Sequence, residues 1–579
     1  MCGISGCYLQ RTLNDNDIKI MRRIRDSLHH RGPDGAGEYI DSEQGIYMGH
    51  RRLSIIDLDK RSAQPMKSER QIISFNGEIY NYVELREQMV AEYKFKTKSD
   101  TEVLIHAWDK WGNSALLKLD GMYAFALHDK AGLNLITDFF GEKPLYILET
   151  MDGFYYASEP SPLIKAFKLK WAPSAQALSQ FIHLGYVEPP ETGYEGLKAL
   201  PPATHLVISK KHEVRTHRYW KPKKPTIEKG SIKPVTDSDI DQVHDLLCKS
   251  LEKRLRSDVS VGLFLSGGVD SALVGALAKN DLNIDLNSYT VSFLDGVDES
   301  PYATEIAKYL GIRHQIIETD KDKSWRDAPK SLKSIYGLPN DNMTALAVQS
   351  MCAAANNHLT VALSGLGGDE LFYGYNKYET LLRNAWIYNF PANFAPLINV
   401  LPISKARTVA ALISGDAMRR FLRIKNGTAQ EAIENMNIEA LDNMLESSIS
   451  GLAHQVRFFD LISTMPQSSI PAIDRGSMRE SIEVRTPFLN RDLCDFVMTL
   501  DQRALIHKEK KHVLRRLLER YMPLDLLTPT KQGFVYPFAR YFNQNNYQFS
   551  CDPDLIKSHP RLAMRQCLLA AMTSNTLIA

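Results

Sequence analysis

The sequence predicts two domains: a mixed α and β domain first, followed by a parallel α/β domain whose later part is helical. Short β-like runs bounded by Gly, Asn or Asp recur over residues 1–219, whereas β-like and helical patterns alternate beyond residue 238. A segment rich in Pro and Lys separates the two regions. The chain has 579 residues, more than one hydrophobic core usually serves. We therefore expect each domain to bury a core of its own.

The first domain is expected to contain many strands and two helices. Helical patterns occupy NDIKIMRRIRDSLHH (16–30) and SDTEVLIHAWDKWG (99–112). In the second of these, Ser99 or Asp100 stands at the N-cap position and Glu102 in the first turn. The β-like runs are GIYMGHRRLSII (45–56), QIISFNG (71–77), YAFALHD (123–129), LNLITD (133–138), PLYILE (144–149) and HLVISKK (205–211).

The sharpest change of composition is WKPKKPTIEKGSIKPVTD, residues 220–237, where Pro and Lys alternate with little apolar content. Proline favours an extended backbone, and lysine keeps such a segment solvated. We therefore expect a linker at 220–237, between a first domain at 1–219 and a second domain at 238–579.

The second domain is expected to open with a helix, because residues 238–255 place apolar side chains at 240, 243, 247 and 251. VSVGLFLSGGVDSALVGALAKN (259–280) then has the pattern of a strand, a Gly-rich turn and a helix. The β-like runs SYTVSFL (288–294) and LTVALSG (359–365) alternate with the helical pattern PYATEIAKYLG (301–311), as βαβ units require. After about residue 376 the pattern is almost wholly helical.

Composition and charge argue against several classes of function. The net charge is +2 and the pI is about 8.0, with basic and acidic residues interspersed, so we expect no nucleic-acid partner. The seven cysteines include no CxxC pair, which suits reduced thiols. Charged residues near the start and prolines in the longest apolar stretch argue against a secretory signal and a membrane span. We expect a cytoplasmic protein, with a homodimer as one option for its oligomeric state.

A Gly-rich turn at LFLSGGVDS (263–271) has the pattern of a phosphate site. Glycine lets backbone N–H groups approach an anion, and the following helix N-terminus adds partial positive charge. The turn is neither a Walker A loop nor a GxGxxG dinucleotide loop. SGGxDS instead resembles the pyrophosphate loop of ATP pyrophosphatases, which split ATP into AMP and pyrophosphate.

A second Gly-rich turn, LTVALSGLGGDELFYGY (359–375), contains Asp369 and Glu370. In a parallel sheet both turns lie at the carboxyl ends of strands, on the ligand-binding edge. We therefore expect Asp270 and Asp369 to share a Mg²⁺ ion that neutralises pyrophosphate, since Mg²⁺ prefers oxygen ligands.

The opening residues, MCGISG, make Cys2 the N-terminal residue once Met1 is removed. A thiolate is the active nucleophile and needs a nearby base. The α-amino group of a mature Cys2, with an ordinary pKa of about 8, is such a base. Cys2 is therefore a candidate nucleophile.

Five polar turns follow Cys2: HHRGPDG (29–35), GHRRLSIIDL (49–58), SFNGEIYN (74–81), SDTEV (99–103) and GEKPLY (141–146). Together they resemble the glutaminase domain of class II glutamine amidotransferases, which are N-terminal-nucleophile hydrolases. With SGGVDS, SGLGGDE, DRGSMRESIEVRTPFL (474–489) and KQGF (531–534), nearly the whole chain resembles the glutamine-hydrolysing asparagine synthetase family. The resemblance implies an αββα sandwich followed by a synthetase domain of the ATP pyrophosphatase type.

For the glutaminase site, the resemblance implies that Cys2 attacks the side-chain amide of glutamine. Asn76 and the backbone N–H of Gly77 would then stabilise the tetrahedral oxyanion. A bidentate contact would join Arg52 to the α-carboxylate, and Glu78 and Asp100 would hold the α-ammonium. The residues implied in glutamine binding are Arg52, Leu53, Ser54, Ile55, Ile56, Asn76, Gly77, Glu78 and Asp100.

For the synthetase site, the resemblance implies backbone contacts to adenine and a further ATP contact in the second Gly turn. Lys511, in KEKKHVLRR, matches a lysine that approaches the reacting phosphate in relatives, although a charge run also fits a solvated helix lysine. The residues implied in ATP binding are Leu265, Ser266, Gly267, Gly268, Asp270, Ser271, Val291, Ser364 and Gly365.

The implied reaction converts glutamine, ATP and a carboxylic acid into glutamate, AMP, pyrophosphate and an amide. Adenylation activates the acid, and ammonia released inside the protein attacks it. Aspartate is the main expected acid, which would make the product asparagine. An alternative is amidation of another carboxylate, such as a uronic acid sugar of a surface polysaccharide. A regulatory relative without turnover is a further alternative, against which Cys2, Asn76, Asp100 and SGGVDS argue.

The chain departs from the family pattern at four positions. Leu366 stands where the second Gly turn usually carries an acid that is thought to matter for the acyl-adenylate. Either Glu370 or Asp341 replaces that acid, or the acceptor is not aspartate. The other departures are at Thr137 and near Phe139, where relatives usually have arginine, and at Asn490, where aspartate is common.

Overall fold

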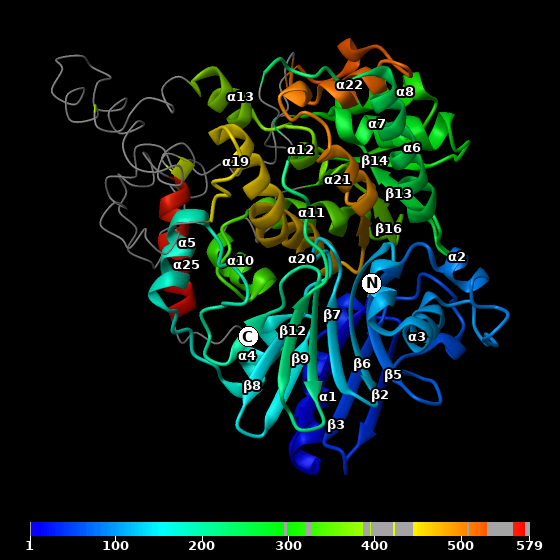
Figure 1. Cartoon of the computed structure of the whole chain (residues 1–579), viewed down its shortest axis with the longest axis vertical. Coiled ribbons are helices and arrows are strands. Elements are labelled where there is room, and N and C mark those ends of the chain that lie inside the picture. Colours follow the sequence, from blue (N-terminus) through cyan, green and yellow to red (C-terminus); the bar gives the residue numbers. More distant parts are fainter. Residues whose placement is uncertain are drawn as a thin grey trace.

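A computed structural model describes residues 2–225, 227, 230–293, 298–319, 327–385, 394, 421–422, 444–506, 509–529 and 560–573. The KQGF motif at 531–534 therefore lies outside the described residues. Figure 1 shows the strand-rich first part of the chain, in blue and cyan, below a second part with most of the helices, in green to orange. The N-terminus lies where the two parts meet.

The first part contains two six-stranded antiparallel sheets. The first sheet has the order β10 (Leu197–Ala199), β8 (Tyr146–Thr150), β9 (Gly153–Ala157), β1 (Gly3–Leu9), β3 (Ile46–Arg52) and β2 (Gly35–Asp41). The second sheet has the order β12 (Val214–Arg218), β11 (Thr204–Ser209), β7 (Gly132–Thr137), β6 (Gly121–Asp129), β5 (Ile72–Ile79) and β4 (Met66–Lys67).

These sheets pack face to face and carry helices on their outer faces. Ile4 and Met48 of the first sheet share a buried cluster with Ala126 and Leu135 of the second. Helices α1 (Asp15–Asp26) and α4 (Pro160–Phe167) pack outside the first sheet, and α2 (Tyr82–Glu87) and α3 (Asp100–Trp111) outside the second. The predicted αββα sandwich is confirmed.

Local sequence signals set the starts of the two predicted helices. Asn14 and Asp17 form a capping box at the start of α1, each side chain accepting a backbone N–H of the other. Ser99 is the N-cap of α3, and its side chain accepts from the Thr101 N–H. Asp100 is therefore the first helical residue, which fixes its carboxylate beside β5.

The second part is built on a five-stranded parallel sheet. Its order is β15 (Arg313–Thr319), β14 (Asn287–Phe293), β13 (Val261–Phe264), β16 (Val361–Leu363) and β17 (Glu483–Arg485). The chain runs outward from β13 to β15 and then returns to the other side of β13. The order therefore reverses between β13 and β16, which is where open parallel sheets bind ligands.

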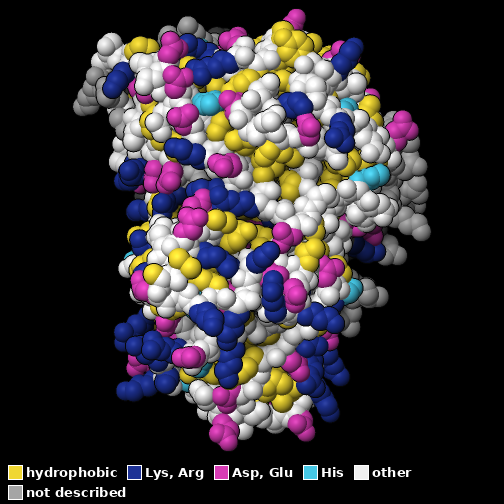
Figure 2. All heavy atoms as spheres, turned by 90° about the vertical axis from the view of Figure 1, so that its right-hand side faces the viewer, with side chains coloured by type: hydrophobic (Ala, Val, Ile, Leu, Met, Phe, Trp, Pro, Cys, Tyr) yellow, Lys and Arg dark blue, Asp and Glu magenta, His cyan; other side chains and the backbone are white. Residues whose placement is uncertain are grey.

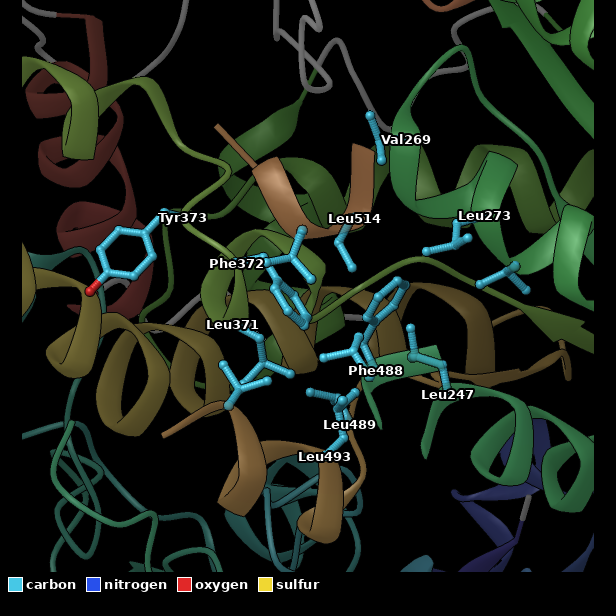
Figure 3. Close-up of a cluster of buried hydrophobic side chains, with 14 of the residues drawn as sticks. Leu247, Val269, Leu273, Leu371, Phe372, Tyr373, Phe488, Leu489, Leu493 and Leu514 are labelled. Atoms are coloured by element: carbon cyan, nitrogen blue, oxygen red, sulfur yellow. The ribbon is translucent and has the colours of Figure 1, made fainter. Parts of the chain in front are cut away.

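Helices cover both faces of this sheet. On one face lie α6 (Asp237–Arg254), α7 (Val269–Asn280), α8 (Ser300–Leu310), α21 (Arg491–Val497) and α22 (His512–Leu518), and on the other α11 (Thr344–Ala355) and α20 (Ile470–Met478). Figure 3 shows part of the hydrophobic core on the face that α6 and α7 cover. There Leu247, Leu273, Phe372, Phe488 and Leu514 converge from separate elements. The remaining helices are α5 (Ala175–Leu184), α10 (Ala328–Tyr336), α12 (Gly368–Leu371), α13 (Asn376–Arg383), α19 (Leu452–Phe459) and α25 (Pro560–Thr573).

The structure adds detail to two sequence expectations. The segment before α6 is not fully solvated, because the ring of Trp220 packs against Phe139 and Phe140. The almost wholly helical pattern after residue 376 is interrupted by β17, whose three residues are all buried. A strand of three residues is too short to show a period of two.

The described surface mixes charges of both signs. Figure 2 shows Lys and Arg interspersed with Asp and Glu over the face that it displays. Among the described helices, none is both long enough and apolar enough to cross a bilayer.

Candidate functional site

Cys2 lies directly before β1, at the open end of the sandwich where the second part of the chain begins. Its backbone nitrogen donates to the Asn76 side-chain oxygen over 2.9 Å. Its Sγ lies 3.9 Å from the Leu53 carbonyl oxygen, and the residue is 7% exposed. Burial raises the pKa of the Cys2 thiol above its ordinary value. A base close to Sγ is therefore needed to form the thiolate.

Asn76 and Gly77 lie on β5, opposite Cys2. Because Asn76 Oδ1 accepts from Cys2, its Nδ2 points elsewhere, and it is buried without a hydrogen-bond partner among the described residues. An unused donor beside a nucleophile is the geometry that stabilises an oxyanion. Gly77 has φ +149°, and an added Cβ would lie 2.1 Å from the Met122 carbonyl oxygen. No other residue fits at position 77 without a backbone shift.

Glu78 and Asp100 lie close together behind these residues. Asp100 accepts from the Ile79 N–H over 3.0 Å, and burial raises its pKa to about 6. Burial, together with the nearby Glu483 and Asp100, raises the pKa of Glu78. Arg485 partly offsets this charge, since its guanidinium lies 3.7 Å from Glu78. Two buried carboxyls with raised pKa values are suited to an ammonium ligand.

The segment from Arg52 to Ile56 follows β3 and passes between the two parts of the chain. The Arg52 guanidinium donates to the carbonyl oxygens of Asp57 and Asp59 within its own loop. Ser54 donates its N–H to Asp34 over 2.7 Å, and Leu53 and Ile55 are buried in a cluster that Ile56 borders. The Ile55 carbonyl accepts from Asp258 of the second part over 2.9 Å. This loop therefore touches both the nucleophile and the second part.

The two Gly-rich turns follow β13 and β16, the strands on either side of the point where the strand order reverses. Ser266 and Ser271 hold the first turn closed, with 3.0 Å between their hydroxyl oxygens, and Gly268 donates its N–H to Ser266. An added Cβ at Gly267 would lie 2.9 Å from Cβ of Tyr302, and one at Gly365 would lie 2.6 Å from Cβ of Asp270. The turns therefore pack directly on each other.

Lys511 lies between the acidic residues of the two turns. Its Nζ is 2.5 Å from Asp270 and 2.6 Å from Asp369, and the residue is 5% exposed. It is not a solvated helix lysine. Two carboxylates that converge on one cationic atom also fit a Mg²⁺ ion, since both supply oxygen ligands at one point.

The other implied ATP contacts lie along the same edge. Leu265 donates its N–H to Tyr289 over 3.0 Å, and its carbonyl accepts from Thr290. Val291 lies one residue further along β14. Ser364 donates its N–H to the Arg485 carbonyl over 2.9 Å. The turn is thereby attached to β17.

Asp341 and Glu370, the two candidate replacements for the acid missing at position 366, have different environments. Asp341 is bound by Arg565 over 2.7 Å, between α5 and α25. Glu370 is buried, accepts from the Tyr375 hydroxyl over 2.7 Å, and has its pKa raised to about 7, chiefly by burial. The other departures have structural roles: Thr137 donates to the Pro201 carbonyl, and Asn490 caps α21.

A buried charge network joins Cys2 to helix α20 of the second part, and sequence reasoning missed it. Arg31 donates to the Cys2 carbonyl over 3.2 Å and pairs with Glu159 over 3.1 Å. Its two terminal nitrogens bind Asp474 at 3.0 and 3.1 Å, and Lys143 lies 3.3 Å from the same carboxylate. The motifs HHRGPDG, GEKPLY and DRGSM contain Arg31, Lys143 and Asp474, but no spacing in the sequence pairs them.

Comparison with known proteins follows the same division of the chain. Residues 1–220 match the glutamine amidotransferase domain family, and residues 242–568 match the asparagine synthase family. The chain is 31% identical to asparagine synthetase [glutamine-hydrolyzing] 1 of Bacillus subtilis, over 93% of this chain and 88% of that protein. It is 29% identical to putative asparagine synthetase [glutamine-hydrolyzing] 2 of Methanocaldococcus jannaschii, over 83% and 98%. It is also 25% identical to amidase chry2 of Gibberella zeae, over 93% and 89%.

An N-terminal-nucleophile sandwich with a buried Cys2, fused to a parallel-sheet domain with two Gly-rich turns, defines a glutamine-hydrolysing ligase. Within that class, the chain belongs to the glutamine-hydrolysing asparagine synthetase family.

Proposed function

We propose that this protein transfers the side-chain nitrogen of glutamine to an acid activated by ATP, and that the acid is aspartate. The observation that carries this proposal is the buried connection from Cys2 through Arg31 and Asp474 to Lys143, since it joins a nucleophile to a cavity that Leu366 of the second Gly-rich turn also lines.

In the glutaminase step, Cys2 Sγ attacks the amide carbon of glutamine, with the α-amino group of mature Cys2 as the base. Asn76 Nδ2 and the Gly77 N–H donate to the oxyanion. Glu78 and Asp100 pair with the α-ammonium. Arg52 pairs with the α-carboxylate after exchanging one of its present carbonyl partners for it.

In the adenylation step, the two Gly-rich turns and the N-terminus of α7 bind the phosphates. Lys511 neutralises charge on the pyrophosphate leaving group. Asp270 and Asp369 would hold a Mg²⁺ ion, which supplies further charge neutralisation when bound. Leu265 and Val291 offer backbone contacts to adenine, and Ser364 and Gly365 a further contact.

The asparagine synthetase names of the relatives support aspartate as the acceptor. Leu366 favours a second candidate, a different carboxylate such as a uronic acid sugar, because leucine cannot bind a metal or accept a proton.

The test is Cys2→Ala in protein with Met1 removed. It abolishes glutamate release from glutamine, while ammonia still supports amide formation. Cys7→Ala, five residues further along, is the control and keeps glutaminase activity. Equal glutaminase rates in wild type and Cys2→Ala would contradict the assignment. Pyrophosphate release is then measured across candidate acids, and no stimulation by aspartate rules out asparagine synthesis.

A further inference from the structure

A small cavity lies where the first part of the chain meets the carboxyl edge of the parallel sheet. Its volume is about 10 Å³, which is room for about one water molecule. Glu142 and Lys143, from the turn between β7 and β8, line one side. Leu366 and Thr486, which follow the adjacent strands β16 and β17, line the other. A larger cavity of about 40 Å³ shares Glu142, Lys143 and Asp474 with it. The cavity thus lies beside the turn that departs most from the family pattern.

The two acidic residues that line the cavity, Asp474 and Glu142, differ in how many of their carboxyl oxygens are already hydrogen-bonded. Asp474 accepts two hydrogen bonds from Arg31 and one from Lys143, and these cations hold its pKa below the ordinary value although burial opposes ionisation. Glu142 is 5% exposed, and its Oε2 accepts from the Thr486 hydroxyl over 2.8 Å. Its Oε1 is buried without a partner among the described residues. Glu142 therefore offers a free carboxylate oxygen.

Glu142 is also held firmly in place. Asp138 accepts the backbone N–H groups of Phe140, Glu142 and Lys143 at 2.9 to 3.0 Å, so the turn wraps around one buried carboxylate. Gly141, with φ +71°, allows the sharp change of direction before Glu142. Because the backbone of this turn is held rigidly, the Glu142 side chain starts from a fixed position.

Amide formation requires a proton acceptor at this point. Ammonia attacks the acyl carbon, a C–N bond forms, and the C–O bond to AMP breaks as AMP leaves. The nitrogen enters with three hydrogens and ends with two, so one proton must be transferred to a base. Leu366 cannot take it, and Asp474 already accepts three hydrogen bonds. Glu370 does not line this cavity.

We propose that Glu142 accepts the proton that ammonia loses when it attacks the activated acyl group. This inference rests on the proposed function, because it requires an acyl-adenylate at the edge of the sheet. Burial and the neighbouring Asp138 raise the pKa of Glu142 to about 8, against the opposing effect of Arg254 and Lys143. Tyr80 and Asp474 also face this region. A base with a pKa near the working pH transfers protons effectively in both directions.

The test is Glu142→Gln, which keeps the size of the side chain and the contact to Thr486. Three readouts are measured: glutamate release from glutamine, the single-turnover burst of pyrophosphate with ATP and aspartate, and amide formation with ammonium chloride as donor. We expect amide formation to fall by about 10²-fold or more. The glutaminase rate and the burst stay within about twofold of wild type, since neither step uses this proton. The matched control, Glu149→Gln, replaces an exposed glutamate of the same part and changes none of the three.

A second variant distinguishes loss of the proton acceptor from structural damage caused by Glu142→Gln. Leu366→Glu in the Glu142→Gln background returns a carboxylate to the wall of the same cavity, and we expect it to restore part of the amide formation. Wild-type amide formation by Glu142→Gln overturns the inference. So does a loss of all three activities that Leu366→Glu does not relieve. If wild-type protein itself makes no amide from any acid, the proposed function fails instead, and the two failures are thereby distinguished.

Discussion

The guanidinium of Arg485 lies 3.7 Å from the Glu78 carboxylate, across the boundary between the two parts of the chain. Arg485 also binds Glu483 over 2.7 Å, and its carbonyl accepts from Ser364 of the second Gly turn. One residue therefore contacts the carboxylate next to the candidate oxyanion site and the turn of the phosphate site. A shift of β17 therefore moves a partner of Glu78 and a partner of the second Gly-rich turn together.

Arg485→Gln is expected to lower the free energy of unfolding by about 3–5 kcal/mol, because it leaves two buried carboxylates without a counter-charge. Chemical denaturation monitored by tryptophan fluorescence measures the change. Arg383→Gln is the control: Arg383 is 74% exposed and pairs with Glu379 on one helix, so its loss costs about 0.5 kcal/mol or less. Similar losses from both variants would show that the buried cluster is not important for stability.

Asn76→Ala is expected to lower kcat for glutamine hydrolysis by about 10² to 10³-fold, because it removes a donor to the oxyanion. The KM for glutamine changes less, since the donor acts mainly in the transition state. Steady-state glutamate release measures both constants. Asn16→Ala, on the exposed face of α1, serves as the control. A rise in KM with an unchanged kcat would mean that Asn76 binds glutamine without stabilising the oxyanion.

The sequence predicts the fold class and about half of the strands of the first part. The six β-like runs of the first part correspond to β3, β5, β6, β7, β8 and β11. Some missed strands are short: β17 has three residues and β4 has two, which is too few to show a period. Three longer strands, β1, β2 and β15, were missed as well, although each has seven residues. Pairing order is likewise absent from local patterns, so the neighbours β16 and β17, more than a hundred residues apart, appear only in the structure.

The candidate site shows the same limit. Cys2, Asn76 and the two Gly turns belong to motifs whose chemistry is visible in a few consecutive letters. Lys511 is ambiguous in the sequence because a buried lysine and a solvated one look alike in a charge run; burial between Asp270 and Asp369 distinguishes them. Glu142 lies in the GEKPLY turn, but nothing in those letters assigns it a role, since its unpaired oxygen depends on a cavity formed by residues from both parts of the chain.

The raised pKa of Asp100 predicts a pH dependence for glutamine hydrolysis. In the free enzyme this carboxyl is protonated below about pH 6 and cannot pair with the α-ammonium of glutamine. We therefore expect kcat/KM to fall about tenfold per pH unit as the pH drops below about 6. Glu78, Glu483 and Arg485 face the same carboxyl and shape the exact midpoint.

Asp100→Asn is expected to remove this acidic limb and to lower kcat/KM above it. Asp109→Asn, near the end of the same helix, keeps the wild-type profile. The profile is recorded as glutamate release between pH 5 and pH 8. An unchanged acidic limb in Asp100→Asn would assign the ionisation to another group, with Glu78 as the next to be substituted.

Lys511→Met separates the roles of the two sites most sharply. The substitution keeps the length of the side chain but removes the cation between Asp270 and Asp369, so the pyrophosphate that forms during adenylation loses a partner of opposite charge. We expect pyrophosphate release to fall by about 10²-fold or more, while glutamate release stays within about twofold of wild type, because Cys2 lies in the other part of the chain.

Lys510→Met is the matched control, since the Lys510 ammonium contacts Asn376 and neither carboxylate. If Lys511→Met and Lys510→Met release pyrophosphate at equal rates, Lys511 only balances the two carboxylates. In that case we expect Asp270→Asn, but not Lys511→Met, to need a higher Mg²⁺ concentration for pyrophosphate release. The reason is that the Mg²⁺ ion would then be held by the carboxylates alone.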